Sequence, residues 1–308
     1  MAFLAVDLGG SHAGCALLEE GVIAISQQVA LPPGQPFDVT LASLTAALMG
    51  CAQSAQTPLK GLGVGFCGLV DARRNRVTST NGKYEEALGF DFEAWGQREF
   101  SLPVRLENDA RLALRGEMAA GAARNSQDVV MFTLGTGIGG VAAMNGSPLV
   151  GAHGQAGVLA GHIPVRPNGR LCTCGAHGCA ESEASGWALP AICRQWPHFA
   201  DSILSGGDLN FRSLFSAAAG GDSVALQIRD HCMEIWGMMT VAAVHSFDPE
   251  LVIFGGAVLG SAAQILPFLR QYVHANAWTP WGKVRLEAAS LGNDAALTGV
   301  PSLFRKER

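Results

Sequence analysis

One histidine and three cysteines are spaced closely enough in this sequence to bind a metal ion together. They are His162, Cys172, Cys174 and Cys179, and the cysteines follow the pattern Cys-x-Cys-x4-Cys. Imidazole nitrogen and thiolate sulfur are typical zinc ligands, and four protein ligands fill a tetrahedral shell without leaving a position for water. The spacing therefore predicts a structural zinc site. The alternative is a flexible loop that carries ordinary buried thiols.

Three glycine-rich turns, each following an apolar segment, could bind phosphate. Glycine exposes backbone N–H groups and lets phosphate oxygens approach them, and hydroxyl side chains add further donors. Each turn alone could be a plain hairpin turn, but three of them favour a nucleotide. The residues that we expect to bind ATP in these turns are Gly9, Gly10, Ser11, Gly135, Thr136, Gly137, Gly255 and Gly256.

Two aspartates stand where strands are expected to end. Asp7 lies beside the first glycine turn and could hold Mg²⁺ through water, although an Asx turn or cap is the alternative. Asp109 follows Asn108 at a strand–helix junction, where a carboxylate could accept the proton of an attacking hydroxyl. Asn108 could then hydrogen-bond a substrate hydroxyl. Asn and Asp are also ordinary helix N-caps.

Two more polar residues could bind a substrate. Glu181 follows the last cysteine of the metal loop closely, so its side chain is expected to be fixed and able to accept vicinal hydroxyls. Its alternative role is an acid at a helix N-terminus near Ser182. Asn81 lies in a polar loop before Gly82. A plain Asn-Gly turn is the alternative there.

Strands that alternate with helices predict an α/β protein to position these residues. We expect strands at 2–6, 14–18, 22–29, 61–66, 104–107, 129–134, 141–144, 148–150, 251–254 and 284–288, and helices at 40–55, 92–100, 109–120, 222–246, 262–272 and 294–304. The N-terminal region is expected to form a strand, a glycine turn with a hydroxyl residue and a return strand, and the same order recurs near residue 135. The pattern thus indicates a repeated unit.

Composition excludes several classes of protein. The 308 residues exceed what one core usually serves, so two lobes are expected. Hydrophobic residues make up 48%, charged residues only 15%, and the net charge is −5. Without a basic block, nucleic acid is not an expected partner. No signal peptide is recognisable and residues 235–244 are too short to span a bilayer, so we expect a cytoplasmic protein with reduced thiols outside the metal loop.

Together these motifs resemble the ROK family of bacterial sugar kinases, repressors and open reading frames. The resemblance rests on the turn with Asp7, the stretch Glu107-Asn108-Asp109, Leu134-Gly135-Thr136-Gly137 and, above all, the zinc loop that ends in Gly-Cys-x-Glu. It implies the actin-like ATPase (ribonuclease H-like) fold, with ATP and sugar in a cleft between two lobes. We place the small lobe at 1–117 plus 290–308 and the large lobe with the zinc loop at 118–289.

The resemblance also implies a reaction, in which the γ-phosphate of ATP moves to a sugar hydroxyl, commonly the 6-hydroxyl of a hexose. Asp109 would be the base, and His162 would touch the sugar as well as zinc. The sugar-binding residues would be Gly68, Asn81, Asn108, Asp109, His162 and Glu181. The DNA-binding module of the family's repressors is not expected, because Asp7 opens the kinase fold near the start. We further expect a homodimer.

The chain departs from the family pattern in three places. The usual Glu-x-Gly-His becomes a stretch with Leu159 and one extra residue before His162, which removes a carboxylate that grips the anomeric end of the sugar; Gln155 could replace it. Ser11 replaces a threonine. Lys83, in a longer polar loop, could reach an acidic or polar substituent.

These departures leave two hypotheses about function. The first is a kinase for a hexose other than glucose, an amino sugar or a ketose. The second is a sugar-binding regulator with weak catalysis on the same fold. The missing glutamate slightly favours the regulator, but the retained Asp7, Asp109 and glycine turns favour the kinase more strongly, since a binder needs no base. A zinc-ribbon interaction protein does not fit the length.

Overall fold

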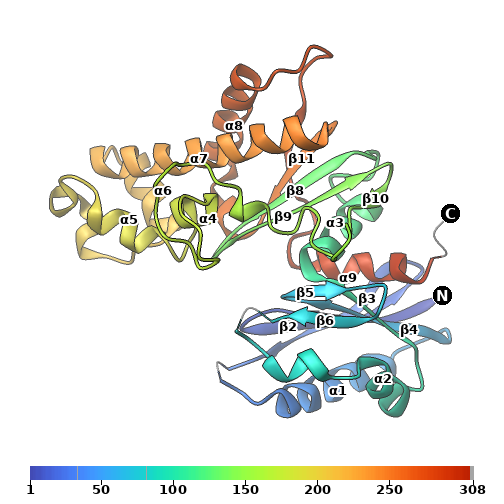
Figure 1. Ribbon diagram of the computed structural model, residues 1–308. Helices are drawn as coiled ribbons and strands as arrows, with labels where there is room; N and C mark the ends of the chain where they lie inside the picture. The colour runs from blue at the N-terminus through green and yellow to red at the C-terminus, as the bar shows by residue number, and fades with distance from the viewer. Residues whose placement is uncertain (33, 81, 306–308) are drawn as a thin grey trace. The chain divides into compact units, whose positions relative to one another are not determined.

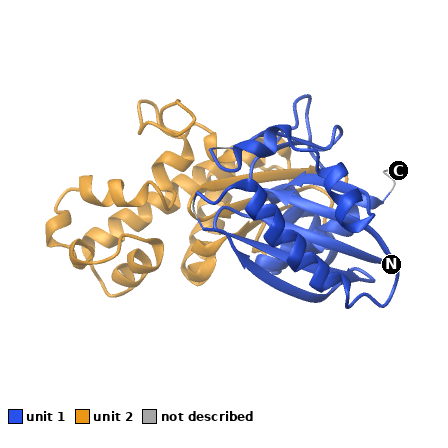
Figure 2. Cartoon of the chain, turned by 90° about the horizontal axis from the view of Figure 1, so that it is seen from below, with its two compact units in different colours: residues 1–125, 148–156, 290–308 blue, residues 126–147, 157–289 orange. Residues whose placement is uncertain are grey.

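The computed structural model describes residues 1–32, 34–80 and 82–305. The chain divides into two compact units, which Figure 2 shows in different colours. Unit 1 comprises Met1–Asn125, Pro148–Ala156 and Ser290–Arg308, and unit 2 comprises Ser126–Ser147 and Gly157–Ala289. Each unit is built around its own five-stranded sheet.

The sheet of unit 1 has three antiparallel strands followed by two parallel strands. In order across the sheet, its strands are β3 (Val22–Ala30), β2 (His12–Glu19), β1 (Ala2–Leu8), β4 (Leu59–Phe66) and β7 (Val104–Asn108). The parallel register pairs Leu8 with Phe66 and Phe66 with Asn108. The C-terminal ends of β1, β4 and β7 therefore meet at one edge, where α/β proteins usually bind ligands.

Side chains on both faces of the unit 1 sheet are buried, because residues along a strand point alternately to opposite sides. Leu4, Val6 and Leu8 of β1 enter one apolar cluster, whereas Phe3 and Ala5 enter another. The helices and remaining strands of the unit are α1 (Phe37–Ala52), α2 (Phe92–Phe100), α3 (Asp109–Ala120), α9 (Ala295–Gly299), β5 (Leu69–Asp71) and β6 (Arg76–Ser79). In α3, a side chain at Gly116 would collide with the backbone of Ala295, so glycine permits α3 and α9 to touch.

The sheet of unit 2 repeats this arrangement. Its strands, in order, are β10 (Ser147–Pro148), β9 (Ile138–Met144), β8 (Val129–Leu134), β11 (Leu251–Gly255) and β12 (Arg285–Ala288). As in unit 1, the first hairpin is antiparallel and the two following strands are parallel. The expected repetition of the hairpin thus extends to the order of both sheets.

The helices of unit 2 surround a long central one. They are α4 (Ala180–Ala184), α5 (Leu189–Gln195), α6 (Phe211–Ala219), α7 (Ser223–Phe247) and α8 (Ala262–Asn276), and Figure 1 shows α7 running beside α8. Asp222 caps α7 by accepting from the N–H groups of Val224 and Ala225. The buried Trp236 ties α7 to α4 by donating to the carbonyl of Ala184 at 3.0 Å. No helix in the described ranges combines the length and the hydropathy needed to cross a bilayer.

Short 3-10 helices complete the two units. They lie at Glu85–Gly89, Ala160–His162, Phe199–Asp201, Ile203–Gly206, Ala257–Ser261, Gly292–Asp294 and Val300–Phe304. Most expected elements are present with ends shifted by a few residues. The expected helix at 294–304 is instead α9 followed by a 3-10 turn that begins before Pro301. The expected strand at 148–150 is reduced to a two-residue strand ending at Pro148, since proline cannot donate to a sheet ladder.

The unit boundaries differ from the expected lobes over two segments. Residues 118–125 and 148–156 group with unit 1 in the structure. The second segment is held there by Arg111, whose Nη2 donates to the carbonyl of Gly154 at 2.8 Å. A side chain at Gly154, whose φ is +74°, would also lie 2.8 Å from the carbonyl oxygen of Val70.

Candidate functional site

Two aspartates flank one glycine at the C-terminal edge of the unit 1 sheet. A Cβ atom at Gly65 would lie 3.4 Å from Oδ1 of Asp7 and 3.6 Å from Cα of Asp109. Burial, and secondarily the charge of Asp109, raises the pKa of Asp7 to about 7. Burial likewise raises the pKa of Asp109 to about 6. Two desolvated carboxylates that lie so close together are suited to proton transfer and cation binding.

Asn108 acts as the N-cap of α3. Its Oδ1 accepts from the N–H of Arg111 at 3.1 Å, and its Nδ2 donates to Asp109 Oδ1 at 2.9 Å and to the carbonyl of Gly68 at 3.0 Å. The structure therefore brings together the predicted residues Gly68, Asn108 and Asp109. It also confirms the capping alternative, and it gives the amide a second task, which is to hold the carboxylate of Asp109.

A buried ion pair supports this strand–helix junction. Arg111 Nη1 contacts Glu107 Oε1 at 2.6 Å, and both side chains are almost completely buried. Breaking a buried pair by removing one partner typically costs about 3–5 kcal/mol, because the other charge stays uncompensated. Sequence reasoning did not assign this role to Arg111, although its i,i+4 spacing from Glu107 was a usable signal.

The first glycine turn connects β1 to β2. The N–H of Gly9 donates to the carbonyl of His12 at 3.1 Å, and the Tyr84 hydroxyl donates to the carbonyl of Gly9 at 2.9 Å. Asp7 precedes this turn and lines a cavity of about 190 Å³ together with His12 and Asp294. Oxygen ligands and room for water fit a hydrated Mg²⁺ ion at this place.

The second glycine turn connects β8 to β9 and is held by Glu181. Oε2 of Glu181 accepts from the N–H of Ile138 at 2.9 Å, and Oε1 accepts from Trp187 Nε1 at 3.3 Å. The N–H of Trp187 also donates to the carbonyl of Thr136 at 2.9 Å. Glu181 lies in the first turn of α4, so the expected fixed side chain is present, with partners in the turn itself.

A cavity of about 490 Å³ opens beside this second turn, entirely within unit 2. The residues that line it are Gly135, Thr136, Gly186, Trp187, Asn210, Phe211, Arg212, Ala257 and Val258. Gly255 ends β11 and Gly256 follows with φ +90°; a side chain at Gly256 would collide with the carbonyl of Leu134. The second and third predicted glycine turns therefore lie side by side at a cavity of the size that small-molecule sites occupy.

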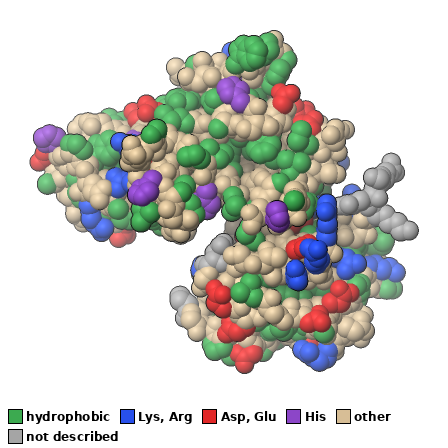
Figure 3. Space-filling model, in the orientation of Figure 1, with side chains coloured by type: hydrophobic (Ala, Val, Ile, Leu, Met, Phe, Trp, Pro, Cys, Tyr) green, Lys and Arg blue, Asp and Glu red, His purple; other side chains and the backbone are tan. Residues whose placement is uncertain are grey.

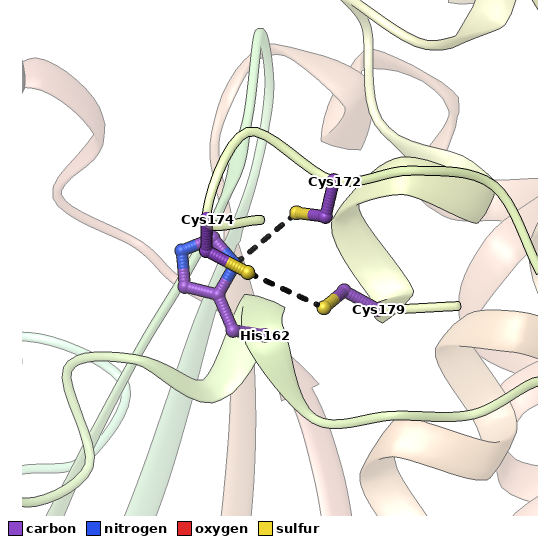
Figure 4. A group of neighbouring side chains, drawn as sticks. All are labelled: His162, Cys172, Cys174 and Cys179. Carbon is purple, nitrogen blue, oxygen red and sulfur yellow. Dashed lines mark hydrogen bonds between the residues drawn. The ribbon is translucent and has the colours of Figure 1, made fainter. Parts of the chain in front are cut away.

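The four predicted metal ligands converge in unit 2. His162, Cys172, Cys174 and Cys179 offer ligand atoms that all lie within 4.8 Å of one another, and Figure 4 shows their side chains pointing toward a common centre. Cys172 Sγ lies 3.4 Å from His162 Nδ1, and Cys174 Sγ lies 3.7 Å from Cys179 Sγ. Sulfur atoms on a tetrahedral zinc ion, each about 2.3 Å from it, lie about 3.8 Å apart. The separations therefore fit zinc and are too long for a disulfide.

The loop that carries these ligands is shaped by glycine and anchored by a buried acid. Gly178 has φ +72°, and a side chain there would collide with the backbone of Arg166. Glu183 is fully buried and accepts from the N–H of Arg170 at 2.6 Å. Its other oxygen lies 3.5 Å from Arg166 Nη1. Sequence reasoning missed Glu183, which fastens the metal loop to α4.

Two residues remain from the prediction of sugar binding, Asn81 and Leu159. Asn81 lies outside the described residues. Leu159 immediately precedes the 3-10 helix that ends at His162, and its side chain is 42% exposed. At the position where the family pattern has a carboxylate, an apolar side chain is therefore presented to solvent.

Acidic and basic side chains occur together on the displayed face of the molecule in Figure 3. Neither unit presents a surface of a single charge sign on that face. This agrees with the modest net charge of −5.

Comparisons with known proteins cover nearly the whole chain. The ROK family matches residues 3–307. A glucokinase of Thermotoga maritima is 28% identical, with 98% of this chain and 97% of that protein covered. An N-acetylmannosamine kinase of Citrobacter koseri is 29% identical over 100% of both chains.

A solved structure extends this likeness to three dimensions. The ROK family glucokinase of Streptomyces griseus, in complex with glucose and AMPPNP, is 30% identical, covers 100% of both chains and has a TM-score of 0.78. The expected actin-like ATPase fold is therefore confirmed. On the family match and this likeness together, the chain belongs to the ROK family.

Proposed function

We propose that this protein is an ATP-dependent sugar kinase that phosphorylates a hexose at its 6-hydroxyl. The observation that carries the proposal is the pair Asp7 and Asp109 beside Gly65, at the edge of the sheet where the first glycine turn begins. A pure sugar binder needs no desolvated base. Similarity to a glucokinase and to an N-acetylmannosamine kinase supports the same reaction class.

The donor nucleotide is proposed to bind the glycine turns. The adenosine part fits the cavity of about 490 Å³ in unit 2, which Thr136 and Trp187 help to line. Gly135, Gly137, Gly255 and Gly256 would supply backbone N–H groups near the phosphates. Gly9, Gly10 and Ser11 of unit 1 would bind the terminal phosphates.

The acceptor sugar is proposed to contact Gly68, Asn81, Asn108, Asp109, His162 and Glu181. Asn108, Asp109 and the backbone at Gly68 form one connected group in unit 1. His162, from the metal loop, and Glu181, from α4, would also contact the sugar, and Asn81 completes the proposed set. Hydroxyl groups need such fixed acceptors, since an unmatched buried polar group lowers affinity strongly.

In the proposed reaction the sugar hydroxyl oxygen attacks the γ-phosphorus of ATP. A new O–P bond forms, the bond between that phosphorus and the ADP oxygen breaks, and Asp109 accepts the hydroxyl proton. Burial raises the pKa of Asp109 to about 6, which keeps a useful fraction deprotonated near neutral pH and makes it a better base than an exposed aspartate.

The metals would serve different purposes. Mg²⁺, which Asp7 would hold through water, neutralises charge on the phosphates when bound. A zinc ion bound by the four proposed protein ligands would be structural and would hold His162 and Glu181 in place. The ligand atom of His162 would be Nδ1, which lies 3.4 Å from Cys172 Sγ.

Glucose is proposed to be a poor substrate. Leu159 replaces the carboxylate that the family pattern provides for the anomeric end of the sugar, and its side chain is exposed. We expect a preference for a hexose that differs from glucose at C1 to C3, which includes amino sugars and ketoses.

ADP release measured over a panel of hexoses, amino sugars and ketoses tests the proposal. We expect sugar-dependent ADP release, with at least one sugar used more efficiently than glucose. Sugar binding without ADP release for every member of the panel would instead support a regulator. Preferential phosphorylation of glucose would refute the specificity argument while leaving the kinase assignment intact.

A further inference from the structure

Lys83 lies directly on the first glycine turn. A Cβ atom at Gly10 would collide with Lys83 Nζ, and it would lie 3.3 Å from Cε and 3.5 Å from Cδ of the same side chain. The end of the lysine therefore packs against the backbone of Gly10. The sequence had suggested a different target for Lys83, an acidic or polar substituent of the sugar.

The loop that carries Lys83 is fastened to the turn at several points. The next residue, Tyr84, donates its hydroxyl to the carbonyl of Gly9 at 2.9 Å, and its φ of +56° turns the chain sharply. Its ring packs against Phe66, with centroids 6.2 Å apart. The N–H of Lys83 donates to the carbonyl of Thr80 at 3.1 Å. Lys83 is exposed, but its loop holds it beside Gly10.

The charges of Lys83, Asp7 and Asp109 all act on one thiol, that of Cys67. The positive charge of Lys83 lowers the pKa of the Cys67 thiol, while Asp109 and Asp7 raise it and burial, the largest cause, brings it to about 12. The three charged groups thus influence the same thiol, on the residue that follows β4. Within the described ranges, Lys83 Nζ forms no ion pair with a carboxylate. Its charge is available for an anionic ligand at Gly10.

We propose that Lys83 binds the γ-phosphate of ATP and stabilises the phosphoryl group during transfer. The proposal rests on the proposed kinase function and adds a residue to it. An ammonium group at Gly10, in the turn that follows Asp7, is placed to offset negative charge at the transferred group. The alternative ligand is an anionic substituent of the acceptor, and the test separates the two.

Nucleotide binding to the full-length protein, without sugar and with Mg²⁺, provides the first test. Lys83→Met keeps the length of the side chain and removes its charge. We expect affinity for AMPPNP to fall about tenfold or more, as for loss of a charged hydrogen bond, while affinity for ADP changes less than about twofold. Lys83→Arg should retain most of the preference for AMPPNP. The matched control is Lys60→Met, an exposed lysine near the opposite end of β4, which should change neither affinity.

Steady-state kinetics with the best sugar provides the second test. Loss of Lys83 should lower kcat by about 10²-fold, in the range seen when one transition-state donor is removed, and leave the KM of the sugar within about twofold. Equal weakening of AMPPNP and ADP would overturn the proposal, and so would a raised sugar KM with unchanged AMPPNP affinity. If no sugar supports ADP release, the proposed kinase function is wrong. The ratio of AMPPNP affinity to ADP affinity still identifies the ligand of Lys83 in that case.

Discussion

The two glycine turns have the same topology but different surroundings. The β1–β2 turn of unit 1 lies among charged groups, namely Asp7, Asp109 and Lys83. The backbone of the β8–β9 turn of unit 2 is fixed by two hydrogen bonds, in which Glu181 accepts from the N–H of Ile138 and the N–H of Trp187 donates to the carbonyl of Thr136. The turn of unit 1 therefore lies beside groups that can react, whereas the turn of unit 2 is held in place by its neighbours next to the metal loop. A repeated element need not repeat its chemistry, because side chains from distant segments determine what each turn can do.

Replacement of Asp109 by Asn should have the largest effect, since it removes the proposed base, which lies at the start of α3. We expect kcat to fall by about 10³–10⁴-fold, at the upper end for loss of a general base. The fold and zinc content should stay unchanged, because Asn keeps the acceptor for the N–H of Ala110. Asp38→Asn, at an exposed position of α1, is the control. Turnover close to that of the wild type would show that Asp109 is not the base.

Replacement of Cys174 by Ser probes the scaffold. The wild-type protein should contain about one zinc ion per chain, as four ligands require. We expect the variant to lose most of this zinc and to unfold at a lower temperature, since zinc affinity and loop folding are coupled. Cys193→Ala removes a buried thiol of unit 2 outside the cluster and should keep its zinc. Elemental analysis that finds no zinc in wild-type protein, purified without chelators, would contradict the site.

Replacement of Glu181 by Gln tests whether the second turn needs its carboxylate. The N–H of Ile138 would then donate to a neutral oxygen, and a charge-assisted bond would be lost. We expect the KM of ATP to rise about tenfold, with bound zinc retained. Glu234→Gln, at an exposed position of α7, is the matched control. A change confined to the KM of the sugar would mean that Glu181 acts only through its proposed contact with the sugar and does not stabilise the turn.

Of these predictions, the smallest effect near neutral pH is expected from protonation of Asp109. Burial raises the pKa of Asp109 to about 6, so kcat/KM should fall about tenfold per pH unit below that value. The stability effect has the opposite sign. A raised pKa favours the protonated folded form, so this contribution to stability is present at acid pH and is lost as the pH rises through about 6. Full kcat/KM retained at pH 4.5 would exclude a base with this pKa.

The spacing of residues along the sequence was sufficient to predict some features of the structure. The four metal ligands could be predicted because Cys172, Cys174 and Cys179 lie within one short loop, where geometry follows from few residues. The strands and long helices could be predicted from their apolar patterns. The short helices α4, α5 and α6 were not predicted, because brief apolar segments carry little periodicity.

Other features depended on contacts between distant segments. The sequence allowed Asn108 to be a cap or a sugar ligand; the structure shows its amide engaged with Gly68, Arg111 and Asp109. Lys83 could have faced the sugar, but Tyr84 fastens its loop to Gly9. No local pattern encodes either contact, since each joins segments that only the folded sheet brings together.

By itself, the sequence determined the family, the α/β alternation and the residue types that could bind zinc, phosphate and a proton, because these depend on composition and short-range order. The tertiary structure alone decided which of these residues meet. Parallel pairing of β1, β4 and β7 brings Asp7 near Asp109 at the ends of strands far apart in the chain. The buried pair Glu107–Arg111 then fixes that junction. Such proximity arises from sheet register and packing, which long-range contacts set and short-range patterns do not record.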